Sequence, residues 1–147
     1  MAAGFTFKTS KLKELQKFLE ELAEKQITQK LLTRNLRIDC NLPLEFISDG
    51  LFESINEFSP FGYGNPEPVF LAKKVTIENM QLVGVEKKHL KLYCSSGGSR
   101  YGAIMFGYDN SLSLSIGDKV DIVYSISQNE WNGNKKLELK IKDIEKD

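Results

Sequence analysis

A proline- and glycine-rich run divides the sequence into two parts that follow different hydrophobic patterns. Residues 60–68 read PFGYGNPEP, which places three prolines and two glycines in nine positions. Proline cannot donate a backbone hydrogen bond and glycine favours turns, so this run is excluded from helices and from central strands. We therefore expect a domain boundary here, with residues 1–66 in one part and residues 67–147 in the other.

The first part is predicted to be mostly helical. A set of apolar residues at helical spacing predicts a helix over about residues 10–25, capped by Thr9 or Ser10 and burying one stripe. That stripe consists of Leu12, Leu15, Phe18, Leu19 and Leu22. A second, shorter helix is predicted from about Asp49 to a buried Phe58, with Ser48 as its cap. Between them, residues 36–42 alternate between apolar and polar side chains, which predicts a half-buried strand that ends at Pro43.

The second part is predicted to be all β. Alternating and β-branched runs predict one long bent strand over residues 69–85, and further strands over about 89–94, 100–106, 120–127 and 137–142. The dipeptide Asn132-Gly133 is a strong hairpin signal. Five strands in about eighty residues suit a small closed Greek-key barrel of the OB type, which makes the fold class α+β. A five-stranded SH3-like barrel would show almost the same pattern, so the pattern alone leaves both open.

The sequence offers no constellation of catalytic or metal-binding side chains. Its one histidine, His89, lies in a predicted strand without neighbours that could complete a catalytic set, so we interpret it as a surface histidine. Cys40 and Cys94 lack metal-ligand spacing and lie in apolar alternating runs, which predicts two buried, reduced thiols. The acidic residues show no paired spacing, and neither a phosphate-binding loop nor a nucleophile elbow is present. We therefore assign no catalytic and no metal residue to this chain.

The outer face of the predicted barrel is the candidate nucleic-acid interface. A single strand is held by a basic groove and by aromatic faces on which bases stack. The charge balances at twenty basic against twenty acidic side chains, so such a partner requires the basic groups to gather on one face. The candidate binding residues are Lys73, Lys91, Tyr93, Arg100, Trp131, Lys135, Lys136 and Lys140. Each also has a purely structural interpretation: the lysines can solvate strands, Tyr93 can pack under a loop, and Trp131 can cover one end of the barrel.

Nothing in the sequence points to a membrane. No stretch approaches the ~18 apolar residues of a membrane span, and the first residues show no basic segment followed by an apolar one. We therefore expect no membrane partner and a cytoplasmic location, where thiols stay reduced.

Several motifs then occur together in one order along the chain. The run PFGYGNPEPVF at residues 60–70 is quite specific, and the shorter motifs are individually weak. The shorter ones are AAG at 2–4, VG at 83–84, HLKL at 89–92, AIMF at 103–106, NEWNG at 129–133 and IKDI at 141–144. In this order they resemble the RecJ family of single-stranded-DNA-specific exonucleases, and the resemblance covers essentially the whole chain.

The resemblance implies that the chain is the C-terminal region of a 5′→3′ exonuclease that acts in recombination and DNA repair. Residues 1–66 would be the C-terminal part of a truncated DHH-associated domain with its linker. Residues 67–147 would be the OB-fold domain that grips single-stranded DNA. The Asp-His-His motif and the carboxylates that bind Mn²⁺ or Mg²⁺ in the family's catalytic domain are absent from this sequence. This chain alone is therefore expected to be inactive and to hold no cofactor.

Three functional hypotheses follow. The leading one is that the barrel binds single-stranded DNA and feeds it to an active site elsewhere. The alternative is an OB-fold protein-interaction module that docks another repair protein, which the balanced charge would suit. Catalysis by this chain alone is the least supported, because no metal or acid–base set is present.

Overall fold

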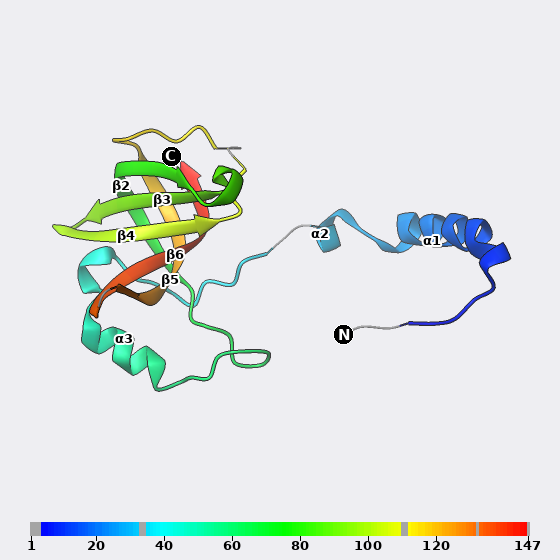
Figure 1. Ribbon diagram of the computed structural model, residues 1–147, viewed down its shortest axis with the longest axis horizontal. Coiled ribbons are helices and arrows are strands. Elements are labelled where there is room, and N and C mark those ends of the chain that lie inside the picture. Colours follow the sequence, from blue (N-terminus) through cyan, green and yellow to red (C-terminus); the bar gives the residue numbers. More distant parts are fainter. Residues whose placement is uncertain (1–3, 33–34, 110–111, 132, 147) are drawn as a thin grey trace. The chain divides into compact units, whose positions relative to one another are not determined.

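Five strands close into a barrel in the computed structural model (Figure 1). The structure describes residues 4–32, 35–109, 112–131 and 133–146, with Gln29, Lys30 and Trp131 described by their backbone alone. The barrel strands are β2 (Phe70–Val83), β3 (His89–Ser96), β4 (Ser99–Phe106), β5 (Lys119–Trp131) and β6 (Asn134–Lys146). All five predicted strands are therefore confirmed, including the single long strand over residues 69–85.

The strand order identifies the barrel as an OB fold. The strands follow one another as β2-β3-β4-β6-β5, and β5 returns to pair with β2, which closes the ring. Strand β4 pairs with β6 in parallel, whereas the other neighbouring barrel strands are antiparallel. A connection that skips a neighbour and returns beside an earlier strand is the Greek-key arrangement of the OB barrel. The predicted OB-type α+β fold is confirmed.

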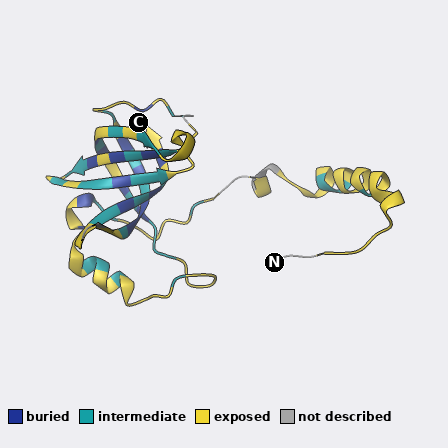
Figure 2. Cartoon of the chain, in the orientation of Figure 1, coloured by how far each residue is buried: buried dark blue, intermediate teal, exposed yellow. Residues whose placement is uncertain are grey.

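Alternation along the strands builds the core. Leu90, Leu92 and Cys94 on β3 are fully buried, as are Val120 and Ile122 on β5. Figure 2 shows that the buried positions gather on the strands of the barrel. Strand β2 reaches both β5 and β3 because its register shifts twice, between Ala72 and Val75 and between Ile77 and Asn79. Such bulges bend a strand and increase its twist. This bend allows one strand to complete the ring.

The segment from Leu42 to Ile47, just before α3, packs onto the barrel. The chain divides into two compact units, residues 1–36 and 37–147. Within the second unit, Leu44 is fully buried in the barrel core. The hydroxyl of Tyr124 donates to the carbonyl of Leu42 at 2.6 Å, and that of Tyr101 donates to the carbonyl of Ile47 at 2.8 Å. The structure thus divides the chain before Arg37, whereas the Pro/Gly run had suggested residue 66 as the boundary.

The strand expected over residues 36–42 is much shorter than its pattern indicated. Only β1 (Cys40–Asn41) forms, in parallel pairing with the first residues of β2. Cys40 is exposed and Cys94 is buried, so the prediction of two buried thiols is wrong for Cys40. The pairing is short because β2 begins only at Phe70, after the Pro/Gly run, and because Pro43 ends β1 on the other side.

A short helix and the Pro/Gly run connect this segment to the barrel. The turn η2 (Leu44–Phe46) leads into α3 (Asp49–Asn56), where the Oγ of Ser48 accepts from the Leu51 N–H at 3.2 Å, so the predicted cap is confirmed. Phe58, which lies beyond the end of α3, is exposed rather than buried. Residues 60–68 form neither helix nor strand, as predicted. The side chain of Asn65 holds this run by donating to the carbonyls of Phe58 and Pro60.

The first unit is helical, as expected. It contains the turn η1 (Thr9–Lys11), helix α1 (Leu12–Gln26) and the short α2 (Gln29–Leu32). Thr9 and Ser10 lie inside the first turn and cap nothing, so that detail of the prediction is wrong. No residue of α1 is buried, and Phe18 is 58% exposed. The turn η1, which contacts α1, is too short to cover the stripe, so the stripe stays exposed or half-buried and its predicted burial is wrong.

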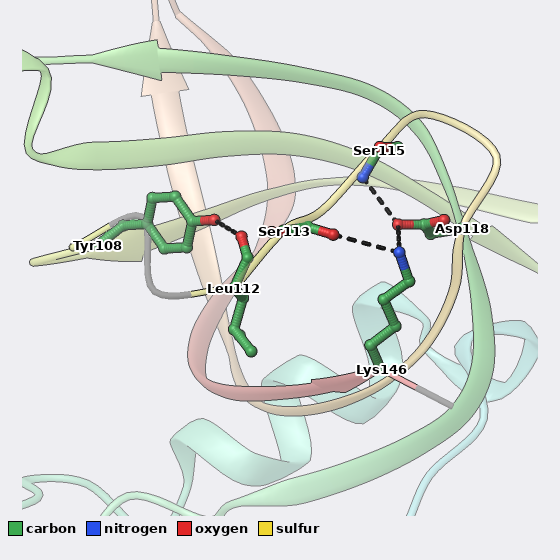
Figure 3. A network of polar contacts seen from close by, with 6 residues as sticks. All are labelled: Tyr108, Leu112, Ser113, Ser115, Asp118 and Lys146. Carbon is green, nitrogen blue, oxygen red and sulfur yellow. Dashed lines mark hydrogen bonds and ion pairs between the residues drawn. The ribbon is translucent and has the colours of Figure 1, made fainter.

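A polar network fastens the long loop between β4 and β5 to the end of β6 (Figure 3). The Oδ2 of Asp118 accepts from the Ser115 N–H at 2.8 Å and pairs with the Nζ of Lys146 at 2.7 Å. The same ammonium donates to the carbonyl of Ser113 at 3.2 Å. The hydroxyl of Tyr108 donates to the carbonyl of Leu112 at 2.6 Å. These contacts hold a loop without regular secondary structure against the barrel.

Candidate nucleic-acid interface

A groove of about 920 Å³ runs across the outer face of the barrel. Its floor and walls come from β3, β4 and the two strands of the β5–β6 hairpin, and the residues just before α3 form part of its rim. The lining residues are Ile47, Ser48, Asp49, Lys91, Tyr93, Arg100, Tyr101, Gly102, Asn129, Lys135, Lys136, Leu137 and Glu138. Five of the eight predicted binding residues are among them.

The alternation that fills the core also sets the groove. Leu92 and Cys94 point into the barrel and are fully buried, so Tyr93 between them points outward, because successive side chains of a strand face opposite sides. Ala103 and Leu139 are likewise buried, which turns their neighbours on β4 and β6 outward. The register places Tyr93, Gly102 and Glu138 side by side on three adjacent strands.

Tyr93 and Arg100 form a layered pair at the centre of the groove. The guanidinium carbon of Arg100 lies 4.7 Å from the centroid of the Tyr93 ring. The Nε of Arg100 also pairs with the Oε2 of Glu78 at 2.5 Å, which fixes the guanidinium in place. Tyr93 is 40% exposed, so it does not pack under a loop. A phenol ring and a guanidinium are both flat groups on which a nucleobase can stack.

Three lysines supply positive charge that no acidic side chain neutralises. Lys91, Lys135 and Lys136 line the groove, and none of them has an ion-pair partner among the residues that the structure describes. Asp49 and Glu138 are the acidic side chains of the lining. The groove is therefore basic within a chain of zero net charge, which is the clustering that a polyanionic partner requires.

The other predicted residues lie elsewhere or are not described. Lys73 lies in the first bulge of β2 and does not line the groove, so its role in binding stays a prediction. Lys140 is half-buried in β6 beside Ile104 and does not line the groove either. Trp131 is the last residue of β5 and pairs with Asn134, but its side chain falls outside the described residues.

Some lining residues were missed by the sequence analysis. Asn129 and Glu138 share the outward phase of their strands with predicted residues, so the same alternation could have found them. Ile47, Ser48 and Asp49 could not be found in this way. They reach the groove only because the tyrosine hydroxyls of the barrel hold the preceding segment.

The titratable groups near the groove are structural. Burial, with a smaller effect of Glu78, raises the pKa of the Cys94 thiol to about 12, so this thiol stays protonated and unreactive. Burial and the nearby Asp49 raise the pKa of Tyr101, so its hydroxyl remains a hydrogen-bond donor. The Nδ1 of His89 accepts from the Gly107 N–H at 3.3 Å, and its ring meets Phe106 edge-on. None of these groups forms an acid–base pair.

The described residues do not fit a metal. Among them, no group of three or more His, Cys, Asp or Glu side chains could hold an ion. The Mn²⁺ or Mg²⁺ implied by the resemblance therefore finds no ligand set in the described part of this chain, and no step is assigned to it. In the same described part, no helix is both long and apolar enough to cross a membrane.

Comparisons with known proteins agree with this fold. The sequence profile of the family described as "RecJ OB domain" matches residues 38–143. The single-stranded-DNA-specific exonuclease RecJ of Bacillus subtilis (strain 168) is 32% identical over 145 residues, which cover 97% of this chain and 18% of that protein. The exonuclease of the same name from Escherichia coli (strain K12) is 28% identical, covering 98% of this chain and 25% of that protein. The chain thus spans about a fifth to a quarter of these relatives' length.

A solved structure shows the same architecture. RecJ from Thermus thermophilus, in a crystal structure in complex with Mg²⁺, superposes with a TM-score of 0.75 at 24% sequence identity. The match covers 98% of this chain and 21% of that one.

Proposed function

The chain belongs to the RecJ family through its OB domain, and from this membership we propose that its groove binds single-stranded DNA. One observation carries the proposal: the basic groove lies where OB barrels bind oligonucleotides. In OB folds that surface is formed by the second and third barrel strands and by the loop between the fourth and fifth. In this chain the corresponding elements are β3, β4 and the β5–β6 hairpin, and they line the groove.

Different side chains of the groove contact the phosphates and the bases of the bound strand. Lys91, Lys135 and Lys136 attract the phosphates, and each phosphate neutralised releases counterions and makes binding sensitive to salt. Tyr93 and Arg100 offer flat surfaces on which bases stack regardless of sequence. Charge then supplies most of the long-range attraction, and stacking holds the strand at one place.

The proposal extends to the longer relatives. In a protein of their kind, the barrel would hold the strand while a separate catalytic domain with Mn²⁺ or Mg²⁺ degrades it from the 5′ end in DNA repair and recombination. Residues 1–66 would then be the end of the DHH-associated domain and its linker. No residue of this chain would take part in the hydrolytic step.

Binding of a labelled oligonucleotide tests the proposal. Fluorescence anisotropy with a 5′-labelled dT oligonucleotide should show that Lys135→Ala weakens binding and flattens the dependence of log K on log salt by about 0.7. Lys119→Ala removes an exposed lysine outside the groove and should leave both quantities unchanged. Equal losses in the two variants, or no binding by the unaltered chain at low salt, would refute the proposed function. A protein captured in place of DNA would favour the interaction-module alternative.

A further inference from the structure

The missing side chain of Gly102 leaves a gap the size of one methyl group at the floor of the groove. Gly102 lies on β4, paired with Tyr93 on one side and with Glu138 on the other. A Cβ placed on Gly102 would lie 3.8 Å from the Cε1 of Tyr93 and 3.8 Å from the Oε1 of Glu138. An aromatic ring and a carboxylate therefore flank one open position. A glycine inside a strand marks a place where a ligand can approach the backbone closely.

Glu138 does not suit a surface that only binds phosphates. Its carboxylate has no hydrogen-bond or ion-pair partner within the described part of the chain, although Lys135 and Lys136 line the same groove. An ionised carboxylate accepts hydrogen bonds and cannot donate them, and it repels phosphate oxygens. A group that fits beside it must therefore present N–H donors, which a nucleobase edge does and a phosphate does not.

We propose that Tyr93, Gly102 and Glu138 form a base pocket that favours guanine over thymine, an inference that rests on the proposed single-strand binding. The base stacks on the ring of Tyr93, above the gap at Gly102. Guanine presents its N1–H and its 2-amino group side by side, so the two oxygens of Glu138 accept from both. Thymine presents one N–H between two carbonyl oxygens, which the carboxylate repels. Single-stranded recognition uses these edges once the bases are splayed and stacked.

The test compares three oligonucleotides of equal length: all dT, dT with one central dG, and dT with one central dA. The dA oligonucleotide controls for the stronger stacking of any purine. Two-point contacts to a base edge discriminate by a factor of about five or more. We therefore expect the unaltered 147-residue chain to bind the dG oligonucleotide at least about fivefold more tightly than the dT one, and more tightly than the dA one.

Two variants connect the preference to the pocket. Glu138→Gln should abolish the preference for dG over dA while leaving dT affinity equal or higher, because a repelling charge is removed. Gly102→Ala fits the backbone at ordinary contact distances and should weaken dG binding by filling the gap. Glu145→Gln, an exposed glutamate at the other end of β6, is the matched control and should retain the preference.

The outcomes separate the inference from the function on which it rests. Binding to all three oligonucleotides with equal affinity would overturn the base pocket and leave single-strand binding intact. A preference for dG that survives Glu138→Gln would also overturn it. No binding to any of the three would refute the proposed function itself.

Discussion

The paired Tyr93 and Arg100 give the sharpest prediction for the groove. We expect Tyr93→Ala to weaken binding of a labelled dT oligonucleotide by about 5- to 150-fold, because base stacking on an aromatic side chain contributes roughly 1–3 kcal/mol. Arg100→Lys should also weaken binding, since lysine keeps the charge but lacks the planar face that lies 4.7 Å from the ring centroid. Glu78 already pairs with Arg100, so the planar face matters more than the charge.

The two side chains act as one stack, so their effects should not add. Residues in contact show coupling of roughly 0.5–3 kcal/mol in double-mutant cycles. The loss of binding free energy in the double variant should therefore be smaller than the sum of the losses in the two single variants. The salt dependence should stay unchanged in Tyr93→Ala, because a phenol neutralises no phosphate.

Fluorescence anisotropy at several salt concentrations measures both quantities. Tyr63→Ala is the matched control, because Tyr63 is a fully exposed tyrosine that does not line the groove. If Tyr93→Ala bound within twofold of the unaltered chain, or if Tyr63→Ala lost as much affinity, the stacking argument would be refuted.

Four further predictions concern the fold. Tyr124→Phe should lower the free energy of unfolding by about 1–2 kcal/mol in urea, because the carbonyl of Leu42 loses its hydrogen-bond donor. A chain of residues 37–147 should unfold at the urea concentration of the full chain's barrel, whereas residues 67–147 should be roughly 3 kcal/mol or more less stable, having lost Leu44 and both tyrosine acceptors. The pKa of Asp118 is lowered, chiefly by its hydrogen bond from Lys146. The contribution of this carboxylate to the free energy of unfolding is therefore complete above the ordinary carboxyl pKa and is lost as the pH falls through the lowered value. Asp118→Asn should flatten that part of a curve of stability against pH. A thiol reagent at pH 8 should modify Cys40 at once and Cys94 only after unfolding, and equal rates by mass spectrometry would contradict the burial of Cys94.

The strands of the barrel could be predicted from the sequence because each strand and turn has its own local sequence pattern. Alternation on β3 and β6 determines which side chains face inward, and the dipeptide Asn132-Gly133 predicts a hairpin at the position where β5 ends and β6 begins. The same alternation placed Lys91 and Tyr93 on the outer face, and the structure brings them into one groove with Lys135 and Lys136 from the start of β6. The choice between OB and SH3-like barrels needed the pairing of β4 with β6, which no local pattern records.

The sequence-based predictions were wrong where contacts between distant parts of the chain determine the structure. Residues 36–42 alternate like a strand, yet only Cys40 and Asn41 pair, because their partner strand β2 begins only at Phe70, after the Pro/Gly run. Lys73 has the character of a binding residue, but it lies in a bulge of β2 outside the groove, so its role in binding stays a prediction. The rim formed by residues 47–49 depends on hydrogen bonds between residues more than fifty positions apart.

The tyrosine bonds to Leu42 and Ile47 attach one wall of the groove to the barrel, whereas the other walls are barrel strands. The floor is a closed ring of hydrogen-bonded strands. This wall belongs to a strap, residues 42–47, which two tyrosine hydroxyls and the buried side chains of Leu44 and Ile47 hold on the barrel. Tension on the chain ahead of Arg37 would act on the strap first. The width available to a bound strand could therefore change while every barrel strand keeps its register.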